Sequence, residues 1–414
     1  MGNKHTLSDL YQMQAMPLSV KIRMTKYRIK QWIERYGEDG VYISFSGGKD
    51  STVLLDIVRQ DYPNIPAVFV DVPTQYPELK EFVKTFENVE ILKPKISFME
   101  VCKRYGFPMF SKEISGCIGE ARKYFENLEK ENNQNTILTD RQTDRQTDRQ
   151  TDLPYAYRIA DLVGIDRRKD KENPEYQNIK KGNIPNAPAR TKQILGIYKH
   201  RENGVDTDEY SKMYDRSKYI FMLDAKFACS DMCCKVMKKA PAHEYGKITG
   251  RKAMTAQMAS ESKLRTSQWI KNGCNGFDMK TPISNPMSFW TEQDVLLYIK
   301  LNNLPICSVY GDVVIDYDAE GSVDGQMDLS ELSADYGLFD TGNRPLKTTG
   351  CSRTGCVLCG FGCHLEKPGE GRFERLKETH PGMYKLLDVI ENNGVTYREA
   401  IDWINEHGNM NIRY

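Results

Sequence analysis

Residues 44–51 read SFSGGKDS, and this short segment has a composition suited to holding phosphate groups. Two adjacent glycines let the backbone come close to a ligand and take unusual φ values. Three serine hydroxyls can donate hydrogen bonds, a lysine supplies a positive charge, and an aspartate can orient the loop or a metal-bound water. The candidate phosphate-binding residues are Ser44, Ser46, Gly47, Gly48, Lys49, Asp50 and Ser51.

The segment lies between an apolar run at 41–43 and a helix-like stretch at 52–58. A loop that follows a strand and begins a helix is where nucleotide phosphates meet backbone N–H groups. Its spacing matches neither G-x-x-x-x-G-K-[ST] nor G-x-G-x-x-G. The sequence therefore predicts a nucleotide-phosphate site of a different type, in which Lys49 supplies the positive charge.

Seven of the eleven cysteines fall into two clusters, CSDMCC and CSRTGCVLCGFGC. Thiolates on tight, glycine-rich turns converge on one centre, which suits zinc or an iron–sulfur cluster. In a chain with no export signal, clustered cysteines indicate metal more often than disulfides. The clustered residues are Cys229, Cys233, Cys234, Cys351, Cys356, Cys359 and Cys363, whereas Cys102, Cys117, Cys274 and Cys307 stand alone and are expected to be small core residues.

The sequence around the phosphate loop alternates between strand and helix patterns, which predicts parallel α/β layers. The expected strands bury short apolar runs, and the expected helices are amphipathic or follow proline and glycine signals. Strands are predicted at 41–45, 66–72 and 89–92, and helices at 20–38, 52–60 and 77–86.

The bulk composition narrows the class of protein. Lys and Arg number 58 against 57 Asp and Glu, a net charge of +1. This balance argues against a general polyanion binder but leaves room for a local basic patch. No apolar stretch of about 18 residues is present, so we expect no membrane span and a cytoplasmic protein.

The α/β pattern is expected to be interrupted by a polar insertion. We predict a nucleotide-binding half at 1–126, an insertion that is largely loop at 127–214, and the second part of the α/β domain at 215–340. A cysteine-rich, metal-binding and helical region follows at 341–414. The insertion has few apolar side chains with which to bury a core face.

Residues 139–152 are a tetrapeptide repeat, TDRQTDRQTDRQTD. The codons ACA-GAC-AGA-CAG encode Thr-Asp-Arg-Gln and are also three copies of the tetranucleotide ACAG. Slippage of such a tract by one unit shifts the reading frame, so one hypothesis is an expression switch. The alternative is a neutral, recently expanded linker, and mixed synonymous codons in the gene would exclude the switch.

SGGKDS resembles the PP-loop of the adenine-nucleotide α-hydrolase superfamily, which includes ATP pyrophosphatases and phosphoadenosine-phosphosulfate (PAPS) reductases. The resemblance implies a Rossmann-like (HUP-type) parallel sheet with helices on both faces. Further matching blocks follow in family order, and among them 248–265 resembles "TG-x-R … ES-x-x-R". The resemblance at 248–265 implies that Arg251 and Arg265 hold anionic groups in catalysis, beside Lys49 and Asp50. The blocks also include Asp71 with Tyr76-Pro77-Glu78, Glu261, Asn285-Pro286, 289–295, Leu304-Pro305 and Tyr310, of which Asp71 and Glu261 are expected at the nucleotide.

The cysteines carry a second resemblance. CCK followed by KKAP resembles the "CC-x-x-x-K-x-x-P" of cluster-bearing sulfonucleotide reductases, in which a distant C-x-x-C completes a [4Fe–4S] cluster. Cys351 and Cys363 are competitors as ligands, because a local tetrad in the second cluster is similar to the DNA-phosphorothioation ATP pyrophosphatases. A mixed set including Cys351 and zinc in place of iron–sulfur are further alternatives. The first-choice ligands are Cys233, Cys234, Cys356 and Cys359.

The resemblance leaves two chemistries open. In the first, ATP is bound with Mg²⁺, pyrophosphate leaves, and an activated acceptor receives sulfur from a thiol or a donor such as a cysteine desulfurase. In the second, PAPS or adenosine phosphosulfate is reduced to release sulfite. Reductases of the family tend to have a degraded loop and a C-terminal "ECG-x-H", whereas this chain has an intact loop and ends NEHGNMNIRY. These features favour the first chemistry.

The sequence does not identify the acceptor or the partners of the protein. A nucleic acid, including a tRNA base, and a small molecule all fit as acceptors. A third reading is a non-catalytic nucleotide-sensing partner of another protein from a mobile-element or defence operon. The sequence does not predict an oligomeric state.

Overall fold

The computed structural model describes residues 3–139, 187–202, 205–317, 319 and 344–414, and the TDRQ repeat from residue 140 onward lies outside them. The described chain separates into two compact units that are each built from two stretches of sequence. The first unit is Met1–Lys95 with Val236–Cys356, and the second is Ile96–Lys235 with Val357–Tyr414. Within the described ranges no helix is both long and apolar enough to cross a membrane.

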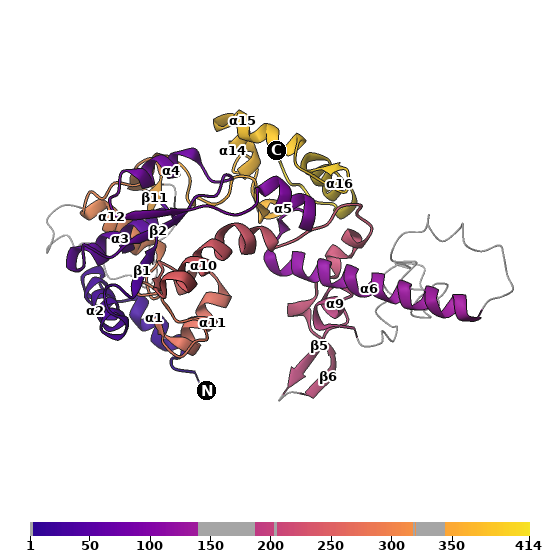
Figure 1. The fold of residues 1–414 in the computed structure, drawn as a ribbon, viewed down its shortest axis with the longest axis horizontal. Helices are drawn as coiled ribbons and strands as arrows, with labels where there is room; N and C mark the ends of the chain where they lie inside the picture. The colour runs from indigo at the N-terminus through magenta and orange to yellow at the C-terminus, as the bar shows by residue number, and fades with distance from the viewer. Residues whose placement is uncertain (1–2, 140–186, 203–204, 318, 320–343) are drawn as a thin grey trace. The chain divides into compact units, whose positions relative to one another are not determined.

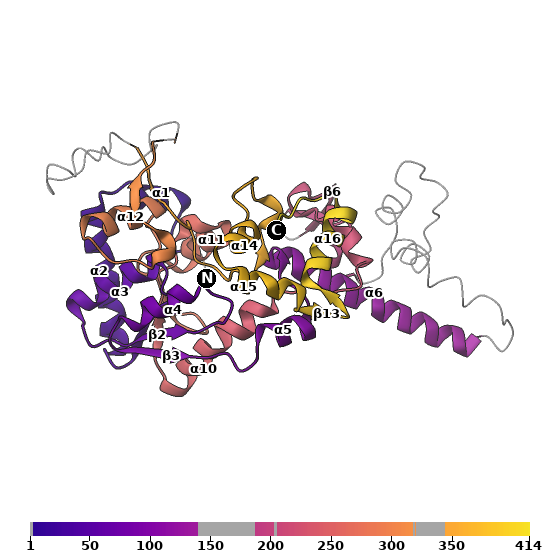
Figure 2. The same cartoon turned by 90° about the horizontal axis from the view of Figure 1, so that it is seen from above.

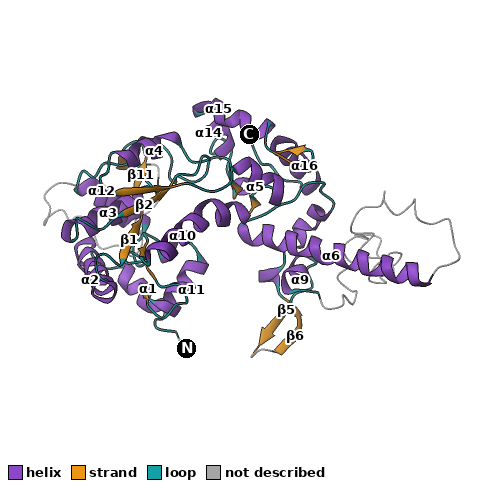
Figure 3. Ribbon diagram, in the orientation of Figure 1, coloured by secondary structure: helices purple, strands orange, loops and turns teal. Residues whose placement is uncertain are grey.

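A six-stranded sheet forms the centre of the first unit, with the order β3-β2-β1-β7-β9-β8 (Figures 1 and 3). Strands β3, β2, β1, β7 and β9 run parallel, and β8 is antiparallel to β9. The strands β2 and β3 pair side by side over four residues (Figure 2). The strands are β1 (Val41–Ser44), β2 (Ala67–Val70), β3 (Val89–Leu92), β7 (Lys252–Met254), β8 (Asn275–Gly276) and β9 (Ile283–Ser284).

The order of the strands in this sheet indicates where a ligand binds. From β1 the chain moves outward to β2 and β3, and it returns later to the other side of β1 with β7 and β9. The order therefore reverses between β1 and β7, and ligands of open α/β sheets bind at the carboxyl ends of the strands at such a point. Ser44 ends β1 and Thr255 follows β7.

Helices and short elements cover both faces of this sheet. Side chains of a strand alternate between faces, and here Ile43 faces the α2, α3 and α12 side while Tyr42 packs with Tyr245 of α10 on the other. The helices are α1 (Leu7–Gln14), α2 (Leu18–Tyr36), α3 (Lys49–Asp61), α4 (Pro77–Lys84), α10 (Ala240–Thr249), α11 (Lys263–Asn272) and α12 (Glu292–Leu301). The smaller elements are η4 (Cys234–Lys239), η5 (Ala259–Glu261), η6 (Ser308–Tyr310) and the β10 (Val313–Ile315)–β11 (Leu346–Thr348) pair.

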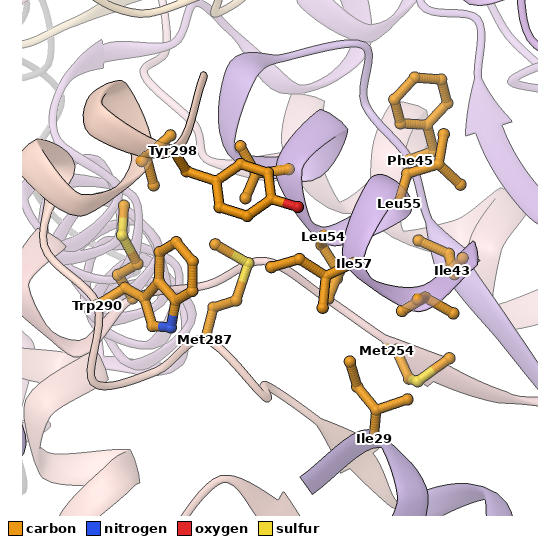
Figure 4. Close-up of a cluster of buried hydrophobic side chains, with 14 of the residues drawn as sticks. Ile29, Ile43, Phe45, Leu54, Leu55, Ile57, Met254, Met287, Trp290 and Tyr298 are labelled. Carbon is orange, nitrogen blue, oxygen red and sulfur yellow. The ribbon is translucent and has the colours of Figure 1, made fainter. Parts of the chain in front are cut away.

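The larger core cluster lies between α2, α3, α12 and the sheet (Figure 4). Ile43 and Met254 come from the strands, Ile57 comes from α3, and Trp290 and Tyr298 come from the α12 region. Each is almost completely buried, and burying one such side chain contributes about 1.5–3 kcal/mol. This packing fixes the start of α3, and so the phosphate loop, against the end of β1.

The predicted elements of this unit are confirmed with small shifts at their ends. The strand predicted at 41–45 is β1, and those at 66–72 and 89–92 are β2 and β3. The helix predicted at 20–38 is α2, which ends where Gly37 takes φ +76°. The helix predicted at 52–60 begins three residues earlier, at Lys49, since Gly48 takes the N-cap position.

The second unit interlocks three stretches of chain. Strand β12 pairs in parallel with β4, and Arg122 of α6 donates hydrogen bonds to the carbonyl oxygens of Met222, Ala225 and Phe227. Neighbouring helices α14 and α15 are seen together in Figure 2. The helices are α5 (Phe98–Tyr105), α6 (Lys112–Thr139), α9 (Ala189–Ile194), α14 (Arg372–Thr379), α15 (Pro381–Tyr384) and α16 (Tyr397–Gly408). The strands and short helices are β4 (Met109–Phe110), β5 (Lys199–Glu202), β6 (Val205–Tyr210), η2 (Lys212–Tyr214), η3 (Ser217–Leu223), β12 (Gly360–Phe361), η7 (Cys363–Leu365), η8 (Lys385–Asp388), β13 (Glu391–Asn392) and β14 (Val395–Thr396).

This arrangement divides the chain at other places than the predicted ones. Helix α6 continues through position 126, where the insertion was expected to begin, up to Thr139. The helical region expected within 341–414 includes α16, which begins with a capping box in which the Thr396 side chain accepts from the Glu399 N–H. Contacts between distant segments, rather than composition, decide the division into units.

Candidate nucleotide-binding site

The phosphate loop is organised by its own hydroxyls. The Ser46 hydroxyl accepts from the Gly48 N–H at 3.3 Å and lies 3.0 Å from the Ser51 hydroxyl. Ser51 in turn donates to the Gly48 carbonyl at 2.9 Å. Gly47 has φ +71°, and a side chain there would also press on Val83 and Leu79. The two glycines and the serines therefore hold one loop shape at the start of α3.

Gly48 provides no side chain to cap α3, so the positive end of the helix dipole faces the loop. A Cβ atom at Gly48 would lie 3.1 Å from the Tyr310 hydroxyl and 3.2 Å from Thr354 Oγ1. Tyr310 accepts the Lys49 N–H at 3.1 Å, and its hydroxyl lies 2.7 Å from the Thr354 hydroxyl. Tyr310 and Thr354, which are distant from the loop in sequence, thus hold it in position.

Lys49 is nearly buried, with 3% of its side chain exposed. Its Nζ lies 3.0 Å from Glu292 Oε1 and 3.6 Å from Asp50 Oδ1, and it donates to the Ser352 carbonyl at 3.0 Å. Burial alone would lower the pKa of Lys49, but the carboxylates of Asp50 and Glu292 and the Tyr310 hydroxyl raise it above its ordinary value. The ammonium group is therefore charged throughout the neutral range.

The Asp50 carboxyl responds mainly to its burial, which raises its pKa against the opposite influence of the Lys49 ammonium. Glu292 adds to the rise, while the Arg353 guanidinium opposes it. A carboxylate held beside one lysine and one arginine neutralises part of their charge until an anion arrives.

A cavity of about 540 Å³ opens above this loop. Besides Lys49, its basic side chains are Lys238, Arg265 and Arg353. Burial and then the like charge of Arg353 lower the pKa of Arg265, which also forms an ion pair with Glu261. Guanidinium groups placed near one another favour a phosphate or sulfate ligand between them. The remaining lining residues are Ser44, Ser46, Gly48, Asp50, Ser51, Gln75, Thr255, Ala256, Gln257, Met258, Ser260, Glu261, Thr291, Glu292, Tyr310, Thr354 and Gly355.

Most of the predicted site residues line this cavity, but three do not. Gly47 lies behind the loop against α4, and Asp71 is engaged by Lys80 in an ion pair. Arg251 donates to the Tyr245 hydroxyl at 2.7 Å and pairs with Glu90, so its guanidinium is used within the sheet region. The structure therefore places Arg265, but not Arg251, with the phosphate loop.

Arg353 and Thr354 were not predicted as site residues. They lie within the second cysteine cluster in sequence, and the spacing of the cysteines there indicated a metal site rather than a nucleotide site. Tyr310 stood in a matching block without a role. In the structure its hydroxyl accepts a hydrogen bond from the Lys49 N–H, so its role is to position the phosphate loop.

The cysteines of the second unit gather around one tyrosine. Burial raises the pKa of Tyr397 strongly, and the thiols of Cys359, Cys102, Cys363 and Cys233 add to this effect. This neighbourhood combines two of the first-choice ligands, one competitor and a residue expected to belong to the core. Burial likewise raises the pKa of Cys102 and Cys363.

Across the described ranges, no group of three or more His, Cys, Asp or Glu side chains is arranged to hold a metal ion. Cys356 ends the first unit, while Cys233, Cys234 and Cys359 belong to the second. Arg372 donates to the Cys359 carbonyl, and its charge only partly opposes the rise in the pKa of Cys363 that burial causes.

A phosphate cradle at the point where a doubly wound parallel sheet reverses its strand order defines a nucleotide-binding α/β protein with a PP-loop. The family model for the phosphoadenosine phosphosulfate reductase domain matches residues 40–150 and 195–360. The chain therefore belongs to the PAPS reductase domain family, which comprises nucleotide-binding enzymes.

Comparison with other proteins adds two findings. One similar solved structure is the phosphate complex of phosphoadenylyl-sulfate (PAPS) reductase from Candida auris, at 12% identity and a TM-score of 0.32. The alignment covers 71% of this chain and 89% of that chain. No curated protein matches this chain.

Proposed function

We propose that the protein is an ATP pyrophosphatase that activates an acceptor for sulfur transfer. One observation carries the proposal: the cavity above the intact phosphate loop gathers Lys49, Arg265 and Arg353, and no cysteine is among its described lining residues. Such a site is equipped to stabilise negative charge on phosphates. It offers no thiol to attack a sulfate group.

In the proposed reaction, an oxygen of the acceptor attacks the α-phosphorus of ATP. The bond between that phosphorus and the α,β-bridging oxygen breaks, and pyrophosphate leaves with both electrons of the bond. Lys49, the α3 N-terminus and the two arginines stabilise the charge that develops on the leaving group. The sulfur of a thiol or of a persulfide donor then bonds to the acceptor atom that carries the AMP, and the bond from that atom to the AMP oxygen breaks, so AMP leaves. With a persulfide donor, a second thiol then reduces the resulting disulfide and leaves the sulfur on the acceptor.

Mg²⁺ is expected with the nucleotide. It binds through one or two carboxylates plus phosphate oxygens and keeps several waters, so a complete cage of protein ligands is not needed. Asp50, Glu261 and Glu292 are the acidic side chains lining the cavity. They are the candidates to hold a Mg²⁺–ATP complex.

Reduction of PAPS or adenosine phosphosulfate is the second candidate, and the name of the matching family supports it. That reaction needs a nucleophilic thiol. The four cysteines of the first unit, Cys274, Cys307, Cys351 and Cys356, are all buried. Burial raises the pKa of Cys274 and of Cys307, which makes these two thiols poor nucleophiles near neutral pH. The last cysteine in the sequence is Cys363, whose thiol is buried as well.

The experiment is to identify the products formed from ATP and Mg²⁺, with water taking the place of the acceptor oxygen. We expect AMP and pyrophosphate, separated by ion exchange, in amounts that rise together with time. ADP and orthophosphate would mean cleavage at the γ-phosphate and would contradict the proposal. Bound ATP with no product over hours, with every acceptor offered, would support a nucleotide sensor instead.

A cysteine-bound metal is a separate prediction, and no step of the reaction passes through it. We expect anaerobically purified protein to contain iron and acid-labile sulfide, held by thiolates that include Cys233 and Cys359. Either Cys233→Ser or Cys359→Ser should remove most of the iron. Cys274→Ser, at a buried core cysteine of the first unit, should retain it. Wild-type protein without iron, or with zinc alone, would exclude the cluster.

A further inference from the structure

A second cavity of about 1250 Å³ adjoins the phosphate cavity within the first unit. The two share Ser44, Lys238, Thr255, Gln257, Met258 and Arg265 as lining residues. Its walls come mainly from α10, β7, α11 and the segment before β9. A molecule bound there lies next to the phosphates held by the loop.

This second cavity is strongly basic although the chain as a whole carries a charge of only +1. Glu244 is the one acidic side chain among its described lining residues, and Lys95 pairs with it at 2.8 Å. The positive charge of the cavity is therefore in excess and has to be balanced by a ligand or by counterions. The basic lining residues are Lys238, Lys239, Lys247, Arg251, Lys252, Arg265 and Lys280.

Several of these charges are available to a ligand. Lys239, Lys247 and Lys280 are exposed, and none of the three takes part in an ion pair within the described part of the chain. Arg251 is already engaged with Glu90, so it contributes less. Three lysines without an ion pair, from the end of η4, from α10 and from the β8–β9 connection, point to a ligand with several negative charges.

The other lining groups suit bases better than a simple polyanion. Gln257 and Gln268 supply amide donors and acceptors, and Ile248 presents an apolar side chain that is 77% exposed. Trp269 also lines the cavity, but it is buried and stacked on His5, with ring centroids 4.5 Å apart, so it is not a free stacking surface. Positive charge matches the phosphates of a nucleotide chain, and the amide groups can form hydrogen bonds with its base edges.

We propose that this cavity binds single-stranded nucleic acid. Its volume of about 1250 Å³ exceeds the roughly 300–1000 Å³ that is typical of small-molecule sites. A base edge also has to leave the helical stack to reach an enzymatic centre, which favours an unpaired strand over a duplex. The role of this strand as the acceptor that is adenylated rests on the proposed ATP pyrophosphatase activity; its binding does not.

The test measures binding of a fluorescein-labelled single-stranded RNA and DNA of about a dozen nucleotides by anisotropy. The triple variant Lys239→Ala, Lys247→Ala, Lys280→Ala removes the unpaired lysines. The matched control, Lys26→Ala, Lys30→Ala, Lys84→Ala, removes three lysines that are ion-paired elsewhere on the first unit. Both variants lose the same charge, so a general electrostatic effect would appear in both.

We expect the cavity variant to bind at least about tenfold more weakly than the control, with a salt dependence flatter by about 2 in log Kd against log[salt]. Binding by wild-type protein should persist with saturating non-hydrolysable ATP analogue, because the strand occupies the neighbouring cavity. Equal loss in both variants, displacement of the strand by the analogue, or stronger binding of a duplex would each overturn the inference.

A failure of the proposed ATP pyrophosphatase activity would give a different set of results from a failure of strand binding. Wild-type protein that binds the strand but releases no pyrophosphate would remove the enzymatic proposal and leave the binding site in place. Lys49→Ala should bind the strand as wild-type protein does, because Lys49 does not line the second cavity.

Discussion

Lys49→Ala is expected to reduce pyrophosphate release from ATP by about 100-fold or more, which is the usual loss when a preorganised charge-stabilising group is removed. The Lys49 ammonium lies at the N-terminus of α3, within 3.0 Å of Glu292 and beside Asp50. Without it, these two carboxylates repel the incoming phosphates instead of balancing a cation. Turnover would be measured with an enzyme-coupled pyrophosphate assay.

Two controls separate chemistry from folding. Lys26→Ala removes a lysine that pairs with Asp61 at the far end of α3, and we expect its turnover to equal that of wild-type protein. Thermal unfolding of Lys49→Ala checks that the variant is folded at the assay temperature, because Lys49 is nearly buried and Asp50 loses its cationic neighbour. Turnover retained in Lys49→Ala would remove the phosphate loop from the mechanism.

Asp294→Ala is expected to lower the free energy of unfolding of the first unit by about 3–5 kcal/mol, the usual cost of leaving a buried charge without its partner. The Nζ of Lys21 donates to both Asp294 carboxylate oxygens at 2.7 Å, and the two side chains are 0% and 2% exposed. Burial already lowers the pKa of Lys21 in spite of Asp294. Guanidinium unfolding followed by tryptophan fluorescence would measure the change, since Trp32, Trp269 and Trp290 lie in this unit.

A double variant distinguishes the ion pair from the other role of Asp294, which caps α12 by accepting from the Thr291 N–H at 2.7 Å. Lys21→Met with Asp294→Ala removes both buried charges and should recover most of the lost stability. The remaining deficit should be about 1 kcal/mol, the value of the cap. A double variant as unstable as Asp294→Ala would show that the cap, and not the buried charge pair, dominates.

The parts of the fold that depend on short-range patterns could be predicted from the sequence. Buried strands could be predicted at 41–45 and 66–72 because apolar runs of this length end in turn signals. The phosphate loop was readable because its glycines, serines and lysine are consecutive. Parallel pairing followed from the alternation with helices, and the sheet order β3-β2-β1-β7 then places the loop at a switch point.

The parts that depend on contacts between distant segments could not be predicted. Tyr310 reaches the Lys49 N–H from 261 positions along the chain, and Arg353 reaches the same cavity from farther still. Arg251 matched a family block, yet its guanidinium is committed to Glu90 and Tyr245. Spacing within a motif does not say which neighbour a long side chain will find.

The arrangement of the cysteines could also not be predicted from their spacing in the sequence alone. Their spacing indicated a metal centre. The gathering of Cys102, Cys233, Cys359 and Cys363 around Tyr397 depends instead on how Ile96–Lys235 and Val357–Tyr414 pack together. The ligand set therefore stays a prediction that metal analysis of the serine variants decides.

The central claim is that the nucleotide is cleaved at its α-phosphate and that no sulfate is reduced. The most direct test compares pyrophosphate release from ATP with sulfite release from PAPS, on the same anaerobically purified protein with a thiol reductant present. The account predicts pyrophosphate from ATP and no sulfite from PAPS. Sulfite without pyrophosphate would contradict it and would make the protein a reductase whose nucleophile is an external thiol or one of its own eleven cysteines.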